Sequence, residues 1–324
     1  MNRRDTLVAL FAFGAVPGLV NAQQRPVPRI GLLIAETLSA QDSRADGLRA
    51  GLHDHGYIEG KNIVIEVRSA DGDYDRLPAL AADLVKLKVA VIVAFGTKAV
   101  LAAGRATTTI PIVDPVMGDP VAVGLSSSFA RPGGNITGSA QFGRESVAKR
   151  LEFLKEAAPR ITRVAFLFNP ANPSGRLTFD ALRATAEALK LELQALEVRT
   201  AKEFGATFAA IAQGRAEAIV ISTDTLFQAN AIEIADFAAK QRLPSAGATA
   251  YAVAGGLIGY GVNDADMYRH AAYFVDRLLK GAKPGDLPIE RATRLELVIN
   301  LETANALGIT VPKSLLVRAD EVIR

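Results

Sequence analysis

Short apolar runs alternate with longer amphipathic segments along most of the chain. The runs are rich in valine and isoleucine and are too short for free-standing helices, which is typical of buried parallel strands. In the first half we predict strands at Arg29–Ala35, Asn62–Arg68, Val91–Phe95 and Ile110–Val113. The amphipathic segments between them predict helices, most clearly at Asp75–Lys88, where leucines recur at helical spacing.

A short helix and turn are predicted at Val121–Phe129. The same alternation resumes after a loop rich in proline and glycine and a predicted strand that leaves the first half. Helices are predicted at Glu145–Ala157, Ser174–Lys190, Ala201–Gln213, from Thr223 to about Gln241, and at Asp264–Lys280. Strands are predicted at Arg163–Phe168, Glu192–Val198, Ala216–Ser222, Leu243–Ala246, Leu257–Gly259 and Arg294–Asn300. A chain of 324 residues is also long for one ordinary core. The pattern therefore predicts an α/β protein with two lobes, each built on a parallel sheet covered by helices.

The N-terminus has the three parts of a secretory signal peptide. A charged head at Asn2–Asp5 precedes an apolar stretch, Leu7–Val20, which is too short to span a bilayer. Small residues follow, so we predict that residues 1–22 are a signal peptide cleaved after Ala22 and that the mature protein is periplasmic. Arg3 and Arg4 leave both the Sec and the twin-arginine route open. The alternative is a buried N-terminal helix.

The amino-acid composition of the chain excludes several classes of function. Hydrophobic residues make up 49% of the chain and charged residues 22%, and the net charge is only +3 without clusters of basic and aromatic residues. We therefore expect no nucleic-acid partner. The sequence contains no cysteine, which excludes disulfides, thiolate nucleophiles, cysteine-ligated metals and a lipid anchor on an N-terminal cysteine. We expect no covalent membrane anchor.

Polar loops recur where the predicted strands end, in both halves of the chain. They are Gly96-Thr97, Met117–Asp119, Asn169–Asn172, Ser222–Asp224 and Tyr260-Gly261. Ligands of open α/β sheets bind just beyond the carboxyl ends of the strands, so two facing sheets would place these loops on one small-molecule cleft. Each loop taken alone is equally explained as an ordinary turn or helix cap.

Candidate catalytic groups are sparse. The sequence has three histidines, and no serine elbow, phosphate loop or dinucleotide fingerprint is present. His53 and His55 precede a helix-stopping glycine and lack a third metal ligand. We therefore predict no enzymatic activity, no metal and no cofactor, and keep a two-lobed enzyme acting in the same cleft as the alternative.

Several stretches resemble the solute-binding proteins of ABC transporters in the tryptophan/tyrosine-type family. They are the run from Gly47 to Thr97, IPIVDPVMGDPVAVGLSSSFARPGGNITG, RVAFLFNPANP and LPIERATRLELVINLETANALGITVPKSLLVRADEVI. The resemblance implies the type I periplasmic binding protein fold, two Rossmann-like lobes joined by three crossover segments. It implies closure on a small polar ligand, such as an aromatic or other amino acid, and delivery to a membrane permease with its ATPase. A regulator of the sugar-repressor kind would instead need a DNA-binding headpiece before the first strand.

The resemblance also implies candidate ligand-binding residues. They are Gly96, Thr97, Asp119, Asn169, Asn172, Thr223, Asp224 and Tyr260. For an amino-acid ligand, Thr97 and neighbouring backbone N–H groups would bind the carboxylate, and Asp119 or Asp224 would bind the amine. These loops contain no arginine that could clamp the carboxylate.

Each lobe is expected to be built from two separate segments of the chain. We assign residues 26–141 and 262–290 to the N-terminal lobe and residues 142–261 and 291–324 to the C-terminal lobe. Hinges are expected near Gly138–Phe142, Tyr260–Asn263 and Leu287–Thr293, where the chain would cross between lobes. The protein is expected to be a monomer.

Overall fold

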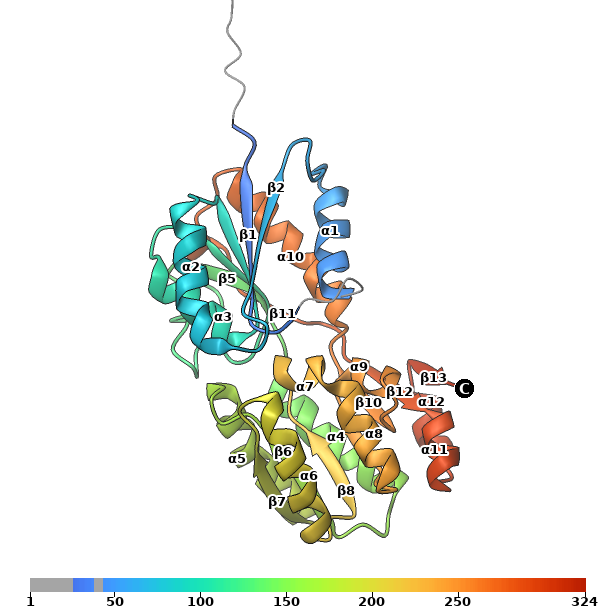
Figure 1. Ribbon diagram of the computed structural model, residues 1–324. Coiled ribbons are helices and arrows are strands. Elements are labelled where there is room, and N and C mark those ends of the chain that lie inside the picture. The colour runs from blue at the N-terminus through green and yellow to red at the C-terminus, as the bar shows by residue number, and fades with distance from the viewer. Residues whose placement is uncertain (1–25, 38–42) are drawn as a thin grey trace, which may run out of the picture.

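The computed structural model describes residues 26–37 and 43–324. The predicted signal peptide lies outside these residues. Figure 1 shows two lobes, one above the other, each a sheet flanked by helices. Within the described residues, no helix is both long and apolar enough to cross a membrane.

The first lobe is built on a parallel sheet with the strand order β11-β5-β4-β3-β1-β2. Its strands are β1 (Arg29–Ile34), β2 (Val64–Ser69), β3 (Val91–Phe95), β4 (Ile112–Met117), β5 (Ile136–Ala140) and β11 (Glu290–Arg291). Helices α1 (Ser43–Asp54) and α10 (Asp264–Leu279) cover one face, and α2 (Leu77–Lys86) and α3 (Thr97–Ala106) cover the other. β3 is buried along its whole length, as its apolar run predicts.

The second lobe has a larger sheet with the order β13-β12-β10-β9-β8-β6-β7. Its strands are β6 (Arg163–Phe168), β7 (Glu192–Glu197), β8 (Ala218–Ile221), β9 (Ser245–Gly247), β10 (Ile258–Gly261), β12 (Glu296–Asn300) and β13 (Glu321–Ile323). Its helices are α4 (Gly143–Ala157), α5 (Pro173–Ala188), α6 (Phe204–Gln213), α7 (Thr225–Ala229), α8 (Ala231–Lys240), α9 (Thr249–Val253), α11 (Leu301–Leu307) and α12 (Lys313–Arg318). The two α/β lobes predicted from the sequence are thus confirmed.

Three local predictions are wrong. The sheet of the second lobe is not wholly parallel. The chain reaches β12 from the first lobe, and this strand pairs with β10 in antiparallel orientation. The single helix expected from Thr223 is divided into α7 and α8 at Asn230, whose amide side chain donates to the carbonyl of Leu226 at 2.7 Å. The helix expected at Val121–Phe129 is a series of turns that Asp119 begins by accepting from the N–H of Ala122 at 3.0 Å.

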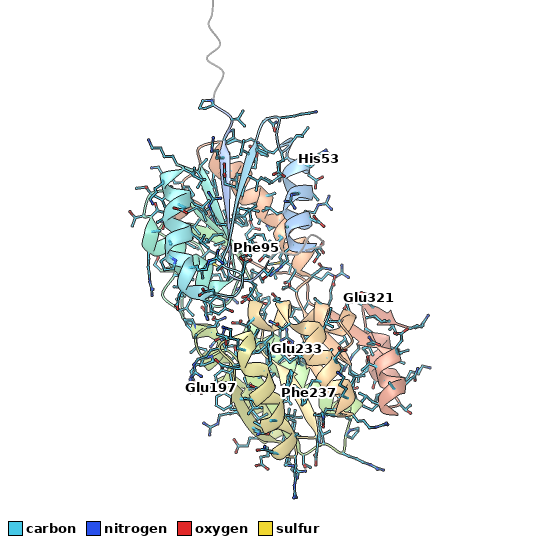
Figure 2. The ribbon with its side chains drawn as sticks, viewed as in Figure 1. His53, Phe95, Glu197, Glu233, Phe237 and Glu321 are labelled. Atoms are coloured by element: carbon cyan, nitrogen blue, oxygen red, sulfur yellow. The ribbon has the colours of Figure 1, made fainter. Side chains whose placement is uncertain are left out.

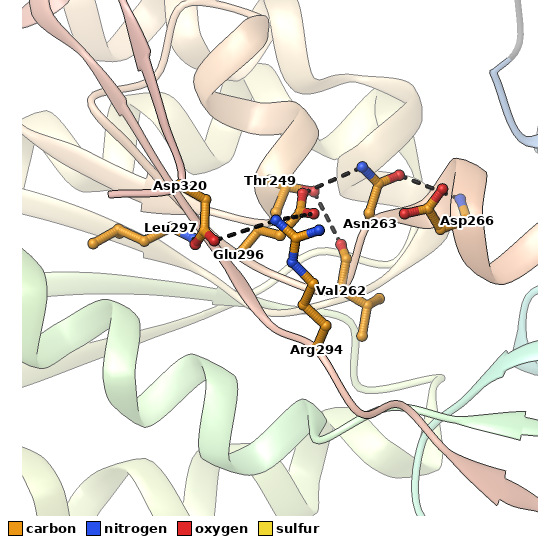
Figure 3. A network of polar contacts seen from close by, with 8 residues as sticks. All are labelled: Thr249, Val262, Asn263, Asp266, Arg294, Glu296, Leu297 and Asp320. Atoms are coloured by element: carbon orange, nitrogen blue, oxygen red, sulfur yellow. Dashed lines mark hydrogen bonds and ion pairs between the residues drawn. The ribbon is translucent and has the colours of Figure 1, made fainter. Parts of the chain in front are cut away.

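The chain passes between the lobes after β5, after β10 and after β11. A polar network ties the last two passages together (Figure 3). Asn263 accepts from the N–H of Asp266 at the start of α10 and donates to Glu296 of β12 at 3.2 Å. Arg294 lies 3.5 Å from Glu296 and 3.4 Å from Asp320. The first turn of α10 is therefore held to the strand that enters the second lobe.

Candidate functional site

The strand ends of both sheets meet at the boundary between the lobes, where two cavities lie side by side. Gly96, Thr97, Lys98, Asn172, Thr223 and Asp224 line the first, which we call the polar cavity and whose void measures about 510 Å³. Gly118, Phe129, Phe142, Ser174, Leu177 and Arg291 line the second, the aromatic cavity, of about 520 Å³. Gln141, which follows β5, borders both cavities. Both volumes include space that is open to solvent.

The first lobe presents the N-terminus of α3 to the polar cavity. Gly96 caps this helix with a φ of +95°, a conformation that glycine adopts without strain, and no side chain caps the first turn. The leading N–H groups of a helix carry partial positive charge and need acceptors. A Cβ atom added to Gly96 would lie 2.8 Å from Cγ2 of Thr225 in the second lobe, so the lobes are in contact here.

The second lobe contributes Asp224, which is buried at the start of α7. Its carboxylate accepts from the side chains of Asn172 at 2.7 Å and Asn169 at 3.4 Å, and from the N–H of Leu226 at 2.9 Å. Burial raises the pKa of Asp224, and these hydrogen bonds oppose the rise. Asn172 also caps α5 by accepting from the N–H of Ser174. Three donors of the protein therefore already satisfy this carboxylate.

A second buried acid approaches from the first lobe. Glu36, at the end of β1, is 4% exposed and accepts a hydrogen bond from the hydroxyl of Tyr74. The ring of Tyr74 in turn lies under Lys98, with Nζ 3.4 Å from the ring centroid. Burial raises the pKa of Glu36, and the charge of Asp224 across the boundary adds to this effect. Burial lowers the pKa of Lys98, while Asp224 and Glu36 partly restore it.

The aromatic cavity combines flat rings with guanidinium groups. Arg291 lies over the ring of Phe129 at 4.4 Å and near that of Phe142 at 5.6 Å. Arg144 forms an ion pair with Asp119 at 2.7 Å. The hydroxyl of Ser174 is buried without a hydrogen-bond partner among the described residues. This cavity can therefore hold an apolar or flat group beside a hydrogen-bonding one.

The structure gathers five of the eight candidate residues around the polar cavity: Gly96, Thr97, Asn172, Thr223 and Asp224. Asp119 borders the aromatic cavity, and Asn169 lies behind Asp224 as its hydrogen-bond donor. Tyr260 borders neither cavity. Its ring packs edge-on against Phe153 at 5.0 Å, in the core of the second lobe.

Sequence reasoning missed the residues that contact the cavities from outside the quoted loops. Lys98 directly follows the candidate loop Gly96-Thr97, so its position in the sequence could have indicated that it lines the site. Gln141 and Arg291 come from segments whose patterns give no sign of a site, and Tyr74 and Glu36 act on Lys98 without lining either cavity. Arg144 and Arg291 supply guanidinium groups that the candidate loops themselves lack.

None of the histidines lines the polar or the aromatic cavity. His53 is exposed on α1, on the outer side of the first lobe (Figure 2). His55 lies 3.9 Å from Asp276, and His270 is 2.7 Å from Glu290. In the described part of the chain, no group of three histidine or acidic side chains could hold a metal ion.

The sequence matches the model of one protein family, described as ABC transporter substrate binding protein, over residues 33–323. The chain belongs to this family. Its fold is the type I periplasmic binding protein fold that the sequence predicted. The family is one of solute-binding proteins, and the comparisons give no support to the enzyme alternative.

Three individual proteins show the same similarity. The chain is 26% identical to the tyrosine-binding protein of Clostridioides difficile (strain R20291) over 82% of this chain and 76% of that protein. An ABC domain in complex with L-Trp from Streptococcus pneumoniae matches with a TM-score of 0.85 at 24% identity, over 91% of this chain and 99% of that one. The ligand-free, open structure of a substrate-binding protein from Clostridium difficile matches with a TM-score of 0.65 at 25% identity, over 92% and 99%.

The two lobes of this substrate-binding protein are in contact beside the cavities, first where Gly96 meets Thr225. The lobes also touch at a second point, since a Cβ atom added to Gly118 would lie 2.5 Å from Oγ and 3.3 Å from Cβ of Ser174. Closure of this kind encloses a ligand between two lobes that each hold part of its contacts.

The contact between Gly118 and Ser174 predicts a variant that impedes closure. Gly118→Ala should weaken ligand affinity about tenfold, because the added methyl group overpacks the contact only when the lobes close. Calorimetric titration measures the affinity, and urea unfolding without ligand should show little change. Gly134→Ala is the control, because its Cβ would meet no atom within 4 Å. Ser174→Gly in the Gly118→Ala background should recover affinity; a failure to recover would contradict this contact as the cause.

Proposed function

We propose that this protein captures a small polar solute in the periplasm and delivers it to an ABC permease with its ATPase. The observation that carries the proposal is the pair of cavities enclosed between the lobes, lined by polar groups from both. The tyrosine-binding relative and the L-Trp complex support a ligand of about the size of an amino acid. The sequence of residues 1–22 supports export, with cleavage after Ala22 and no covalent anchor.

Within this proposal the two lobes share the ligand. Thr97 and the N-terminus of α3 act from the first lobe, and Asn172 and Thr223 act from the second. Asp224 and Asn169 hold Asn172 and the start of α7 in place. The three passages between the lobes form the hinge, and the ligand shifts the population towards the closed form that the permease receives. The mature protein acts as a monomer.

The function is tested with the purified mature protein and a panel of amino acids, organic acids, amines and sugars. A true ligand at about 100 times its Kd should stabilise the fold by about 2.7 kcal/mol, which thermal unfolding detects. Small-angle scattering should show compaction with the same compound. The compound should be recovered unchanged after incubation, and its chemical conversion would favour the enzyme alternative. Absence of any stabilising compound would contradict the proposed function.

A further inference from the structure

The acids around the cavities are already paired with groups of the protein. Asp224 accepts three hydrogen bonds, and Asp119 pairs with Arg144 at 2.7 Å. Asp264, which also borders the polar cavity, accepts from Gln228 at 2.8 Å. Glu145 lies exposed at the start of α4. A ligand ammonium entering the polar cavity would therefore compete with donors that the fold itself supplies.

Lys98, unlike these acids, is not closely paired with a group of opposite charge in the part of the chain that the structure describes. Its Nζ borders the polar cavity and rests on the ring of Tyr74. No carboxylate of the described residues lies within 4.0 Å of Nζ, although Asp224 and Glu36 influence it from farther away. The ring of Tyr74 and the two acids form a cage of the kind that recognises ammonium groups. In this chain, the lysine itself occupies that cage.

We propose that the ligand is a small carboxylate without an ammonium group, and that Lys98 determines this specificity. The inference rests on the proposed function and names its ligand class. The ligand carboxylate pairs with the ammonium of Lys98 and with the uncapped first turn of α3. Thr223 lines the same cavity, and its hydroxyl, which is buried without a hydrogen-bond partner among the described residues, is available as a further donor.

The same arrangement acts against amino acids. An α-ammonium lies within one carbon of its carboxylate, so a carboxylate paired with Lys98 would bring two positive charges together. Repulsion between like charges in a desolvated cavity is a strong means of specificity. The aromatic cavity then receives the remainder of the ligand, beside Phe129 and Arg291.

Matched triads of compounds test the ligand class. Each triad shares one skeleton: 3-(4-hydroxyphenyl)propionate, tyrosine and tyramine; 3-phenylpropionate, phenylalanine and phenethylamine; 4-methylpentanoate, leucine and 3-methylbutylamine. In at least one triad, calorimetry should show the acid binding at least roughly tenfold more tightly than the amino acid, with the amine not binding. Tighter binding of an amino acid or amine in every triad that binds would overturn the inference and leave the proposed function standing. If no member of any triad bound, the inference would be rejected, whereas the proposed function would still be decided by the wider panel of compounds.

Variants of Lys98 test the residue. Lys98→Met should lose roughly 30-fold in affinity for the best acid and should gain affinity for the matching amino acid, because the cage of Glu36, Tyr74 and Asp224 is then open to a ligand ammonium. Lys98→Arg should keep the preference for the acid, which separates loss of charge from misfolding. Lys86→Met, on the exposed face of α2 with a side chain 79% exposed, is the matched control and should change nothing. Unaltered selectivity in Lys98→Met would overturn the role of Lys98.

Discussion

Replacing Asp114 by asparagine is expected to stabilise the protein by about 2–4 kcal/mol at pH 8 and by much less at pH 4. Asp114 lies in β4, is 3% exposed, and accepts from the N–H of Val116 at 3.0 Å. Burial raises the pKa of its carboxyl to about 7. In the unfolded chain this carboxyl ionises near its ordinary value of 3.8. Between these two values the folded state binds more protons, so stability falls as the pH rises from about 4 to 7.

Asparagine keeps the oxygen that accepts from Val116 and cannot ionise, so the Asp114→Asn variant should escape this loss. Urea unfolding at pH 4, 6, 7 and 8 measures the free energy of unfolding of both proteins. Asp180→Asn, at an exposed position on α5, makes the same change of charge and serves as the control. A stability difference between Asp114→Asn and wild type that stayed constant across these pH values would contradict the role assigned to burial.

Much of the fold could be predicted because buried strands and amphipathic helices leave different periodicities in the sequence. The apolar runs that became β3 and β6 are examples, since both strands are almost wholly buried. The direction of β12 could not be predicted in this way. A short apolar run looks the same in either direction, and the antiparallel pairing with β10 follows from where the chain enters the second lobe. The helices α11 and α12 are short and lie in the C-terminal segment, for which the pattern predicts no element.

The site was predictable only in part, for reasons visible at three residues. Asn172 and Asp224 lie in the loops that follow β6 and β8, so a cleft at the carboxyl ends of the strands would include them. Tyr260 also ends a strand, but the alternation of side chains puts it on the same face as Ile258, in the core beside Phe153. A strand end fixes where a residue lies and not which face its side chain occupies.

Interactions between residues that lie far apart in the chain could not be predicted from the sequence. Asp119 was a candidate for the ligand amine, yet in the structure it pairs with Arg144, which comes from the start of α4. Glu36 follows β1 and Lys98 follows β3, so their charges act on each other only because these two strands are neighbours in the sheet. Such contacts join residues far apart in the chain and carry no periodic signal.

Gly138→Ala is expected to cost about 3–5 kcal/mol of folding free energy, through backbone strain and overpacking together. Gly138 lies in β5, opposite Asp114 of β4, and has a φ of +137° that side-chain-bearing residues rarely adopt. An added Cβ atom would lie 2.0 Å from the carbonyl oxygen of Asp114. Because that atom belongs to the backbone, only separation of the two strands could relieve the clash.

The consequences should reach the cavities, since the chain passes from β4 to Gly118 and from β5 to Gln141 at their walls. Urea unfolding should therefore show a large loss of stability, and calorimetry below the unfolding transition a weaker affinity. Gly143→Ala is the control on the same passage between lobes, because its Cβ would meet no atom within 4 Å and its site is the first residue of α4. A loss below about 1 kcal/mol for Gly138→Ala would mean that β4 and β5 yield more readily than close-packed strands should.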